Sequence, residues 1–191
     1  EMSASLVGSE MCIRDRSIDN SLIYITLAVN LLLHMMTTKI TVPEHIREYL
    51  IGKFCNFQET PVRFPDSLDI YHVIYDLLEK RPATHPIDRG NLEILLPVRS
   101  IGKNPETYNY LGVRSQTLIV RQLEIMMWAE MHEFADEQKH RYGVTFIISI
   151  HNFINKYGIT SLSEDAFLKN YYRWRAKVRS KEKRSYKRKS A

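Results

Sequence analysis

Apolar residues recur at every third or fourth position over several stretches of the chain, which is the spacing of one face of an α-helix. This pattern predicts helices over residues 44–54, 67–80, 113–140 and 144–157, and a final helix that starts after Ser163. Two shorter apolar runs, at residues 39–42 and 91–99, have the length of strands and lie next to proline or glycine. The chain is therefore expected to form a helix-rich α+β fold in which helices pack on a small sheet.

Capping and helix-breaking residues set the expected helix boundaries. Pro43 fits the first turn of the helix over residues 44–54, and Asp66 or Ser67 can cap the next helix. Gly143 is expected to end the long third helix. The face of the second helix that is expected to be buried consists of Leu68, Tyr71, Ile74, Tyr75 and Leu78. In the third helix the expected buried face consists of Val120, Leu123, Met127, Met131 and Phe134.

The last two predicted helices are joined by a short turn, residues 158–163. Gly158 followed by Ile159 has the pattern of a helix C-cap with its hydrophobic contact, and Ser163 can cap the helix that follows. Acidic residues occupy the first turn of that last helix, where the positive end of the helix dipole favours them. The buried stripe of the last helix is expected to be Phe167, Tyr171, Trp174 and Val178.

Basic residues are concentrated at the C-terminal end of the chain. Residues 169–191 hold eleven Lys or Arg and one acidic residue, a net charge of +10. The other residues hold 16 basic and 21 acidic side chains, a net charge of −5. A local excess of this size indicates a polyanionic partner, and nucleic acid is the first candidate. A solvated basic surface, an anionic membrane and an acidic protein are the alternatives.

The predicted nucleic-acid-binding residues lie opposite the apolar stripe of the last helix and in the basic segment that follows it. A helix has the width that the DNA major groove admits, and arginine can grip phosphate or guanine through two hydrogen bonds. Arg173 and Arg175 are expected to contact bases, and Lys177 and Arg179 to contact phosphates. The full predicted set is Lys169, Tyr172, Arg173, Arg175, Lys177, Arg179, Lys181, Lys183, Arg184, Lys187, Arg188 and Lys189.

Residues 144–180 are predicted to form two helices joined by a turn, and the second helix is basic. This segment resembles helix-turn-helix DNA-binding modules. The end of the chain also resembles that of small phage and mobile-element proteins. The resemblance implies a non-catalytic DNA-binding protein, such as a regulator or a replication or packaging accessory factor. Its partner would be nucleic acid, DNA rather than RNA, and a homodimer is a possible assembly. A structural or assembly protein whose basic tail binds nucleic acid without sequence preference is the alternative.

Signatures of catalysis, metal binding or a cofactor are few. His132 and Glu133 are followed by Asp136 where an H-E-x-x-H zinc site needs histidine, so an exposed polar helix face is the expected explanation. The seven glycines form no phosphate-binding loop. Two cysteines, Cys12 and Cys55, are too few for a disulfide scaffold and fit a reducing compartment, the cytoplasm. We therefore expect no enzymatic activity, no cofactor, no metal and no membrane partner.

The first 35 residues differ from the rest of the chain. Residues 5–17, SLVGSEMCIRDRS, resemble a translated sequencing-library adaptor, and a leucine-rich segment follows them. The resemblance implies that residues 1–35 are a non-native extension and that the natural start is Met36 or Met35. A membrane anchor and a buried N-terminal helix are the alternatives, although the apolar segment is short for a span. An α+β body is then expected over residues 36–142, a helix-turn-helix-like module over residues 143–180, and a basic, disordered tail over residues 181–191.

Overall fold

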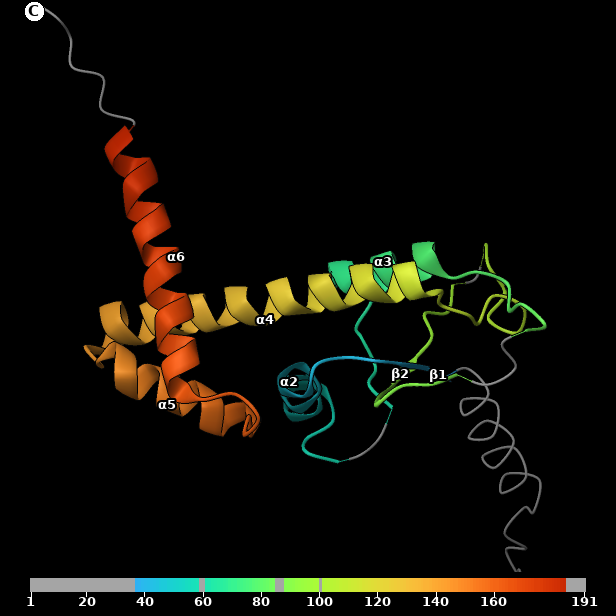
Figure 1. Ribbon diagram of the computed structural model, residues 1–191, viewed down its shortest axis with the longest axis horizontal. Helices are drawn as coiled ribbons and strands as arrows, with labels where there is room; N and C mark the ends of the chain where they lie inside the picture. The colour runs from blue at the N-terminus through green and yellow to red at the C-terminus, as the bar shows by residue number, and fades with distance from the viewer. Residues whose placement is uncertain (1–36, 59–60, 85–87, 100, 185–191) are drawn as a thin grey trace, which may run out of the picture. The chain divides into compact units, whose positions relative to one another are not determined.

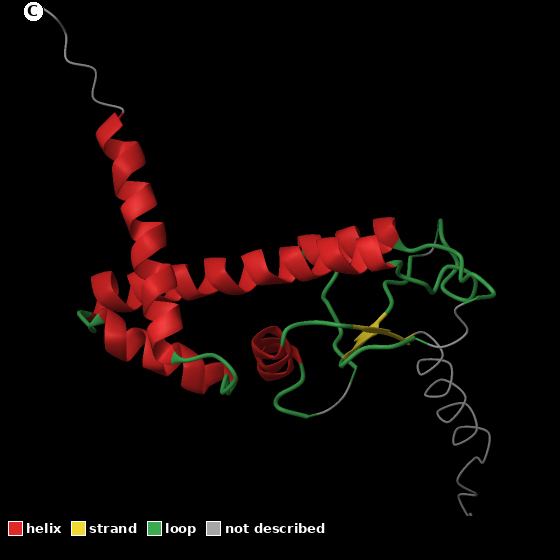
Figure 2. Cartoon of the chain, in the orientation of Figure 1, coloured by secondary structure: helices red, strands yellow, loops and turns green. Residues whose placement is uncertain are grey.

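The computed structural model describes residues 37–58, 61–84, 88–99 and 101–184. Along these residues the elements are β1 (Thr37–Ile40), α2 (Glu44–Phe54), α3 (Asp69–Leu77), β2 (Leu92–Leu95), α4 (Val113–Tyr142), α5 (Phe146–Tyr157) and α6 (Glu164–Arg184) (Figure 1). Figure 2 shows the predominance of helix, and the prediction of a helix-rich α+β fold is confirmed. The described residues all belong to one compact unit, Met36–Ala191. The predicted extension over residues 1–35 lies outside the described part of the chain.

The sheet consists of two short antiparallel strands. β1 and β2 pair with Thr37 opposite Leu95 and Ile40 opposite Leu92. Both predicted strands are thus present, but β1 begins two residues before the predicted segment. β2 is shorter than predicted and ends before Pro97, since a proline has no N–H group to continue the ladder. One face of the sheet packs on the helices, because alternate residues of each strand are buried.

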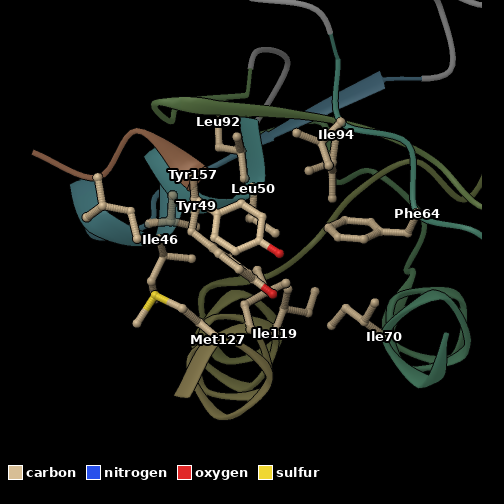
Figure 3. Packing of buried hydrophobic residues seen from close by; sticks show 14 of the residues in the cluster. Ile46, Tyr49, Leu50, Phe64, Ile70, Leu92, Ile94, Ile119, Met127 and Tyr157 are labelled. Atoms are coloured by element: carbon tan, nitrogen blue, oxygen red, sulfur yellow. The ribbon is translucent and has the colours of Figure 1, made fainter. Parts of the chain in front are cut away.

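The long helix α4 carries the centre of the hydrophobic core. Figure 3 shows side chains of α2 packed between those of β2 and those of α4. The helix continues two residues past the predicted end, to Tyr142, and Gly143 ends it in the left-handed conformation with φ of 70°. Val120 and Phe134, which were predicted to be buried, are half-buried at the edge of the core. The buried residues of α4 are Ser115, Ile119, Leu123, Met127, Met131, His132 and Ala135.

Helix α3 is shorter than predicted at both ends. Leu68 occupies its N-cap position, and leucine has no side-chain atom that can form a capping hydrogen bond. The Pro65 carbonyl accepts the Leu68 N–H at 3.1 Å, which forms a turn over residues 65–68 before the helix. The predicted cap by Asp66 or Ser67 is therefore wrong. At the other end of the helix, Lys103 supplies the hydrogen bonds that the last carbonyl groups lack. Its Nζ donates at 2.6–3.1 Å to the carbonyl groups of Tyr75, Asp76 and Leu78.

Helix α5 joins the C-terminal helices to the rest of the core, because it packs against α2, α4 and α6. Gly52 of α2 lies directly against the backbone of Tyr157, and an added Cβ would be 2.5 Å from the Tyr157 carbonyl oxygen. Gly158 takes the left-handed conformation with φ of 63°, and the N–H of the buried Ile159 donates to the Ile154 carbonyl at 3.1 Å. The predicted C-cap is thus confirmed, and residues 143–180 share one buried core with the preceding elements.

Candidate nucleic-acid interface

The first half of α6 is held in the core. The Ser163 carbonyl accepts hydrogen bonds from the N–H groups of Ala166 and Phe167 at 3.0 and 3.4 Å, so the helix starts where the sequence predicts. Phe167 and Tyr171 are completely buried, and Leu162 packs against the same core from the preceding turn. The first two turns of α6 therefore anchor the whole helix.

Aromatic contacts fix the orientation of α6 on α4. The Trp174 ring stacks on the His132 ring, with 4.4 Å between centroids and 11° between planes. The Tyr171 hydroxyl donates a hydrogen bond to the Asp136 carboxylate. Burial and this hydrogen bond raise the pKa of Tyr171 above its ordinary value, so the hydroxyl keeps its proton and its donor role. These contacts determine the direction in which α6 leaves the core.

The second half of α6 leaves the core. All residues from 176 to 180 are exposed, and the backbone remains helical to Arg184. Figure 1 shows this half of the helix projecting past α4 and α5. Val178, which was predicted to be buried, is 37% exposed because the described elements do not reach it. The predicted apolar stripe is therefore right for its first two residues, right in part for the half-buried Trp174, and wrong for Val178.

The predicted basic residues of α6 fall on two flanks of the helix. Arg173 and Lys177 face α4 and border a groove of about 650 Å³. Arg175 is about 160° away from Arg173 around the helix axis. Its guanidinium lies 4.6 Å from the centre of the Phe146 ring of α5, and the side chain is half-buried rather than exposed as predicted. We call the exposed or half-exposed side chains on this side of α6, Tyr172, Arg175 and Arg179, the outer flank.

The remaining predicted residues lie along the helix and beyond it. Lys169 forms an ion pair with Asp165 at 2.6 Å, one turn earlier, and both side chains are exposed. Exposed pairs of this kind are weak, so the ammonium group can exchange its partner for a phosphate at little cost. The α6 backbone carries Lys181, Lys183 and Arg184, while Lys187, Arg188 and Lys189 lie outside the described residues.

His132 does not lie on an exposed polar face, and this part of the sequence prediction is wrong. Its side chain is buried beneath α6, and its Nε2 is 2.8 Å from the Asn170 Oδ1. Burial lowers the pKa of His132 below its ordinary value, which favours the neutral ring with Nε2–H as the donor to the amide oxygen. Glu133, the next residue, is exposed. Within the described ranges, no three His, Cys, Asp or Glu side chains are grouped to hold a metal ion.

A polar cluster where α2, α4 and α5 meet was missed from the sequence. Glu130 accepts hydrogen bonds from the Tyr49 and Tyr157 hydroxyls and from the Lys53 ammonium group. Burial would raise the pKa of Glu130, but the hydrogen bonds from Lys53 and the two tyrosines outweigh it and lower the pKa. The donors lie 27 to 81 residues away in the sequence, so no local pattern could predict the cluster. Because its polar groups bond to one another, the cluster stabilises the junction of the three helices.

A second carboxylate fixes the turn between α5 and α6. Glu48 of α2 accepts four hydrogen bonds of 2.6–3.1 Å from the backbone N–H and hydroxyl groups of Thr160 and Ser161. Burial opposes these bonds but does not cancel them, and the pKa of Glu48 is lowered. The body of the molecule therefore positions the turn, and through the turn it positions α6.

Comparisons with known proteins add no family to this description. No family model, no curated protein and no solved structure matches the chain. Among the residues that the structure describes, no helix combines the length and the apolar character needed to cross a membrane. The function has to be argued from the geometry and the charge of α6.

Proposed function

We propose that the protein binds duplex DNA, without catalysis, through α6 from Tyr172 onward and the basic residues that follow the helix. One observation carries this proposal. Helix α6 is anchored by its first turns, continues to Arg184 and is exposed from residue 176 to residue 180. It lies in the most basic part of the chain. The sequence resemblance suggests the role of a regulator or of a replication or packaging accessory factor of a phage or mobile element. With only two cysteines in the chain, we place this role in the cytoplasm.

The dimensions of a projecting helix favour DNA over duplex RNA. An α-helix with its side chains is about 10–12 Å across, and the major groove of B-DNA is about 12 Å wide. The major groove of A-form RNA is too narrow and deep for side chains to read. Because α6 leaves the core from residue 176 onward, its exposed side chains are free to reach into a DNA groove.

We assign the DNA contacts to the outer flank. Arg175 is held by the Phe146 ring, so it loses little side-chain freedom when it binds a phosphate. Arg179 and Tyr172 are more exposed than Arg175, so we assign the contacts with the bases to these two side chains. Arg173, which the sequence paired with Arg175 for base contacts, faces α4, so we assign it a contribution to the positive potential instead.

The experiment that tests the proposal is a selection of the full chain against a library of random DNA duplexes, followed by affinity measurements on the enriched and on unrelated sequences. We expect an enriched motif that is bound about 10³-fold or more tightly than unrelated duplex. A duplex RNA of equal length serves as the control and should bind more weakly. Absence of binding to any duplex at low salt would overturn the proposal.

The same selection separates the proposal from its alternative. A structural or assembly protein with a non-specific basic segment would bind all duplexes equally, with an affinity that falls steeply with salt. The acidic first turn of α6, where Asp165 pairs with Lys169, favours this alternative, because helix-turn-helix proteins read bases with the N-terminal residues of the recognition helix. Equal binding to every duplex would therefore assign the protein to the assembly class.

A further inference from the structure

The last turn of α4 lies beside the outer flank of α6. Helix α6 crosses α4 at His132 and Asp136, through the ring stack and the hydrogen bond described above. The groove on one side of this crossing is lined by α4 residues between 125 and 133. The last turn of α4, which ends at Tyr142, is on the other side, as the outer flank is. Figure 1 shows this end of α4 extending past α6, on the side away from α3.

One aromatic ring connects the last turn of α4 with the outer flank. Phe146, the first residue of α5, packs on the buried Tyr171 of α6, with 4.8 Å between the ring centres. The Arg175 guanidinium lies 4.6 Å from the centre of the Phe146 ring, and the Lys139 Nζ lies 5.9 Å from it. A cation of α4 and a cation of α6 are therefore held beside the same ring.

These two cations have no carboxylate partner in the described part of the chain, since neither Lys139 nor Arg175 forms an ion pair there. The Lys139 side chain is also not needed to cap α4. The N–H groups of Gly143 and Val144 donate to the Lys139 and Gln138 carbonyls at 3.2 and 3.1 Å. Because Lys139 is exposed and Arg175 is half-exposed, an anion from solution can reach both charges.

The neighbouring Arg141 lies differently, although it belongs to the same basic turn. It forms an ion pair with Glu137 at 2.5 Å, and it is about 160° away from Lys139 around the axis of α4. Basic residues at the end of a helix are favoured by the helix dipole whichever way they point. The dipole therefore accounts for a basic turn, but not for the position of Lys139 next to Arg175.

We propose that Lys139 and Arg175 together bind the phosphate backbone of DNA, so that the last turn of α4 is a second DNA contact beside α6. This inference rests on the proposed binding of DNA by α6 and extends it to another helix. Two cations held beside one ring suit a partner that carries negative charges at short, regular spacing, as a DNA strand does. Contacts with phosphates fix the position of a protein on the duplex without reading its sequence. Lys139 and Arg175 therefore position the outer flank, while Tyr172 and Arg179 contact the bases.

The first test compares two variants that each remove one charge from the same helical turn. Lys139→Gln in the full chain should weaken binding to enriched and to unrelated duplexes by the same factor, about three- to tenfold, and should lower the slope of log K against log salt by about 0.9. Arg141→Gln is the matched control, on the opposite side of α4, and should remain within about twofold of the wild type. Both variants should unfold at the temperature of the wild type, since both side chains are exposed. Equal losses in the two variants, or no loss in Lys139→Gln, would overturn the proposal.

The second test locates the contact on the DNA. In a series of duplexes, one phosphate at a time is replaced by an uncharged methylphosphonate, which should weaken the wild type at each phosphate that it contacts. Lys139→Gln should lose this sensitivity at one phosphate and keep it at the others, because the cation that binds there is already missing. Arg141→Gln should keep the whole profile of the wild type. A Lys139→Gln protein with the profile of the wild type would show that Lys139 contacts no phosphate.

The two tests separate this inference from the proposed function. If the wild type binds duplex DNA and Lys139→Gln binds it equally well, the contact through α4 is wrong and the contact through α6 stands. If the wild type binds no duplex at low salt, both are wrong.

Discussion

At the scale of single residues, the stability of the fold depends on carboxylates that each receive several hydrogen bonds. Glu130 is partly buried and accepts hydrogen bonds from two other helices. Its removal leaves two hydroxyls without this acceptor and takes the charged partner from the Lys53 ammonium group, which keeps the Tyr49 hydroxyl as an acceptor. Exposed carboxylates in the same helix, such as Glu137 beside Arg141, keep their hydration whether or not they are paired. The two kinds of carboxylate should therefore respond very differently to the same substitution.

Glu130→Gln should lower the free energy of unfolding by about 2–3 kcal/mol, because the partly buried Lys53 ammonium group loses its charged partner and one hydrogen bond acceptor becomes a donor. Glu137→Gln is the matched control and should change it by less than about 0.5 kcal/mol. Urea denaturation of both variants measures the difference. Equal, small effects would show that the Glu130 cluster contributes nothing to stability.

His132 should make the stability of the protein depend on pH. Its pKa in the folded protein is lowered from the ordinary 6.5 by burial, so below pH 6.5 the unfolded chain takes up a proton before the folded protein does. Stability is then expected to fall as the pH is lowered from 7 to 5, and to recover as the pH is raised. Urea denaturation at a series of pH values measures this dependence.

His132→Phe removes the titrating group and keeps a ring that can stack on Trp174. This variant should lose less stability than the wild type between pH 7 and pH 5. His140→Phe, at an exposed position of the same helix, should behave like the wild type. A His132→Phe protein with an unaltered pH dependence would mean that the ring is not buried as described.

At the scale of elements, the sequence predicts what is encoded locally. The bounds of α2 and the cap at Gly158 follow from helical spacing and from the need for a left-handed residue, and both are observed. The pairing of His132 with Trp174 was not predicted, because it depends on where α6 crosses α4. The exposure of Val178 was missed for a related reason, since helical spacing shows which residues share a face and not where the covering element ends.

The anchoring of α6 should decrease along the helix. Phe167→Ala removes a completely buried ring and should cost about 3–5 kcal/mol, whereas Val178→Ala should change stability by less than about 0.5 kcal/mol. Trp174→Ala should lie between them, at about 1–3 kcal/mol, because the ring is half-buried at the edge of a groove. Thermal and urea denaturation of the three variants measure the gradient. A Val178→Ala protein as unstable as Phe167→Ala would show that the second half of α6 is packed.

Truncation should separate the contribution of the last residues to DNA binding from that of the helix. Ending the chain after Arg184 removes Lys187, Arg188 and Lys189, and the slope of log K against log salt should become shallower by about 0.9 for each phosphate that the protein no longer neutralises. Ending it after Ser180 removes three further basic residues and should reduce the slope again. Neither change should affect thermal unfolding, since residues 176–180 next to the cut are exposed, and the buried residues described in α6, Phe167 and Tyr171, lie more than two turns earlier. A constant slope would exclude these residues from the interface.

At the scale of the whole molecule, the charge is divided between the C-terminal end and the rest of the chain. The net charge of −5 outside residues 169–191 repels a polyanion, and the +10 within them attracts it. This division should orient the protein so that α6 meets the DNA first, and it should make association faster at low salt. The fold keeps α6 in a fixed direction relative to the rest of the molecule, because three carboxylates hold the start of α6 or the helices beside it. These are Glu48, Glu130 and Asp136.

The central claim is that the outer flank of α6 contacts DNA, and the most direct test is the affinity of one double variant against a matched control. Arg175→Gln with Arg179→Gln removes two charges from the outer flank, whereas Arg63→Gln with Arg89→Gln removes two from exposed positions elsewhere. Fluorescence anisotropy with a labelled duplex at one fixed salt concentration measures both. We expect the first variant to bind about tenfold or more weakly and the control to remain within about twofold of the wild type. Equal losses in the two variants would show that DNA responds only to net charge, and would contradict a binding surface on α6.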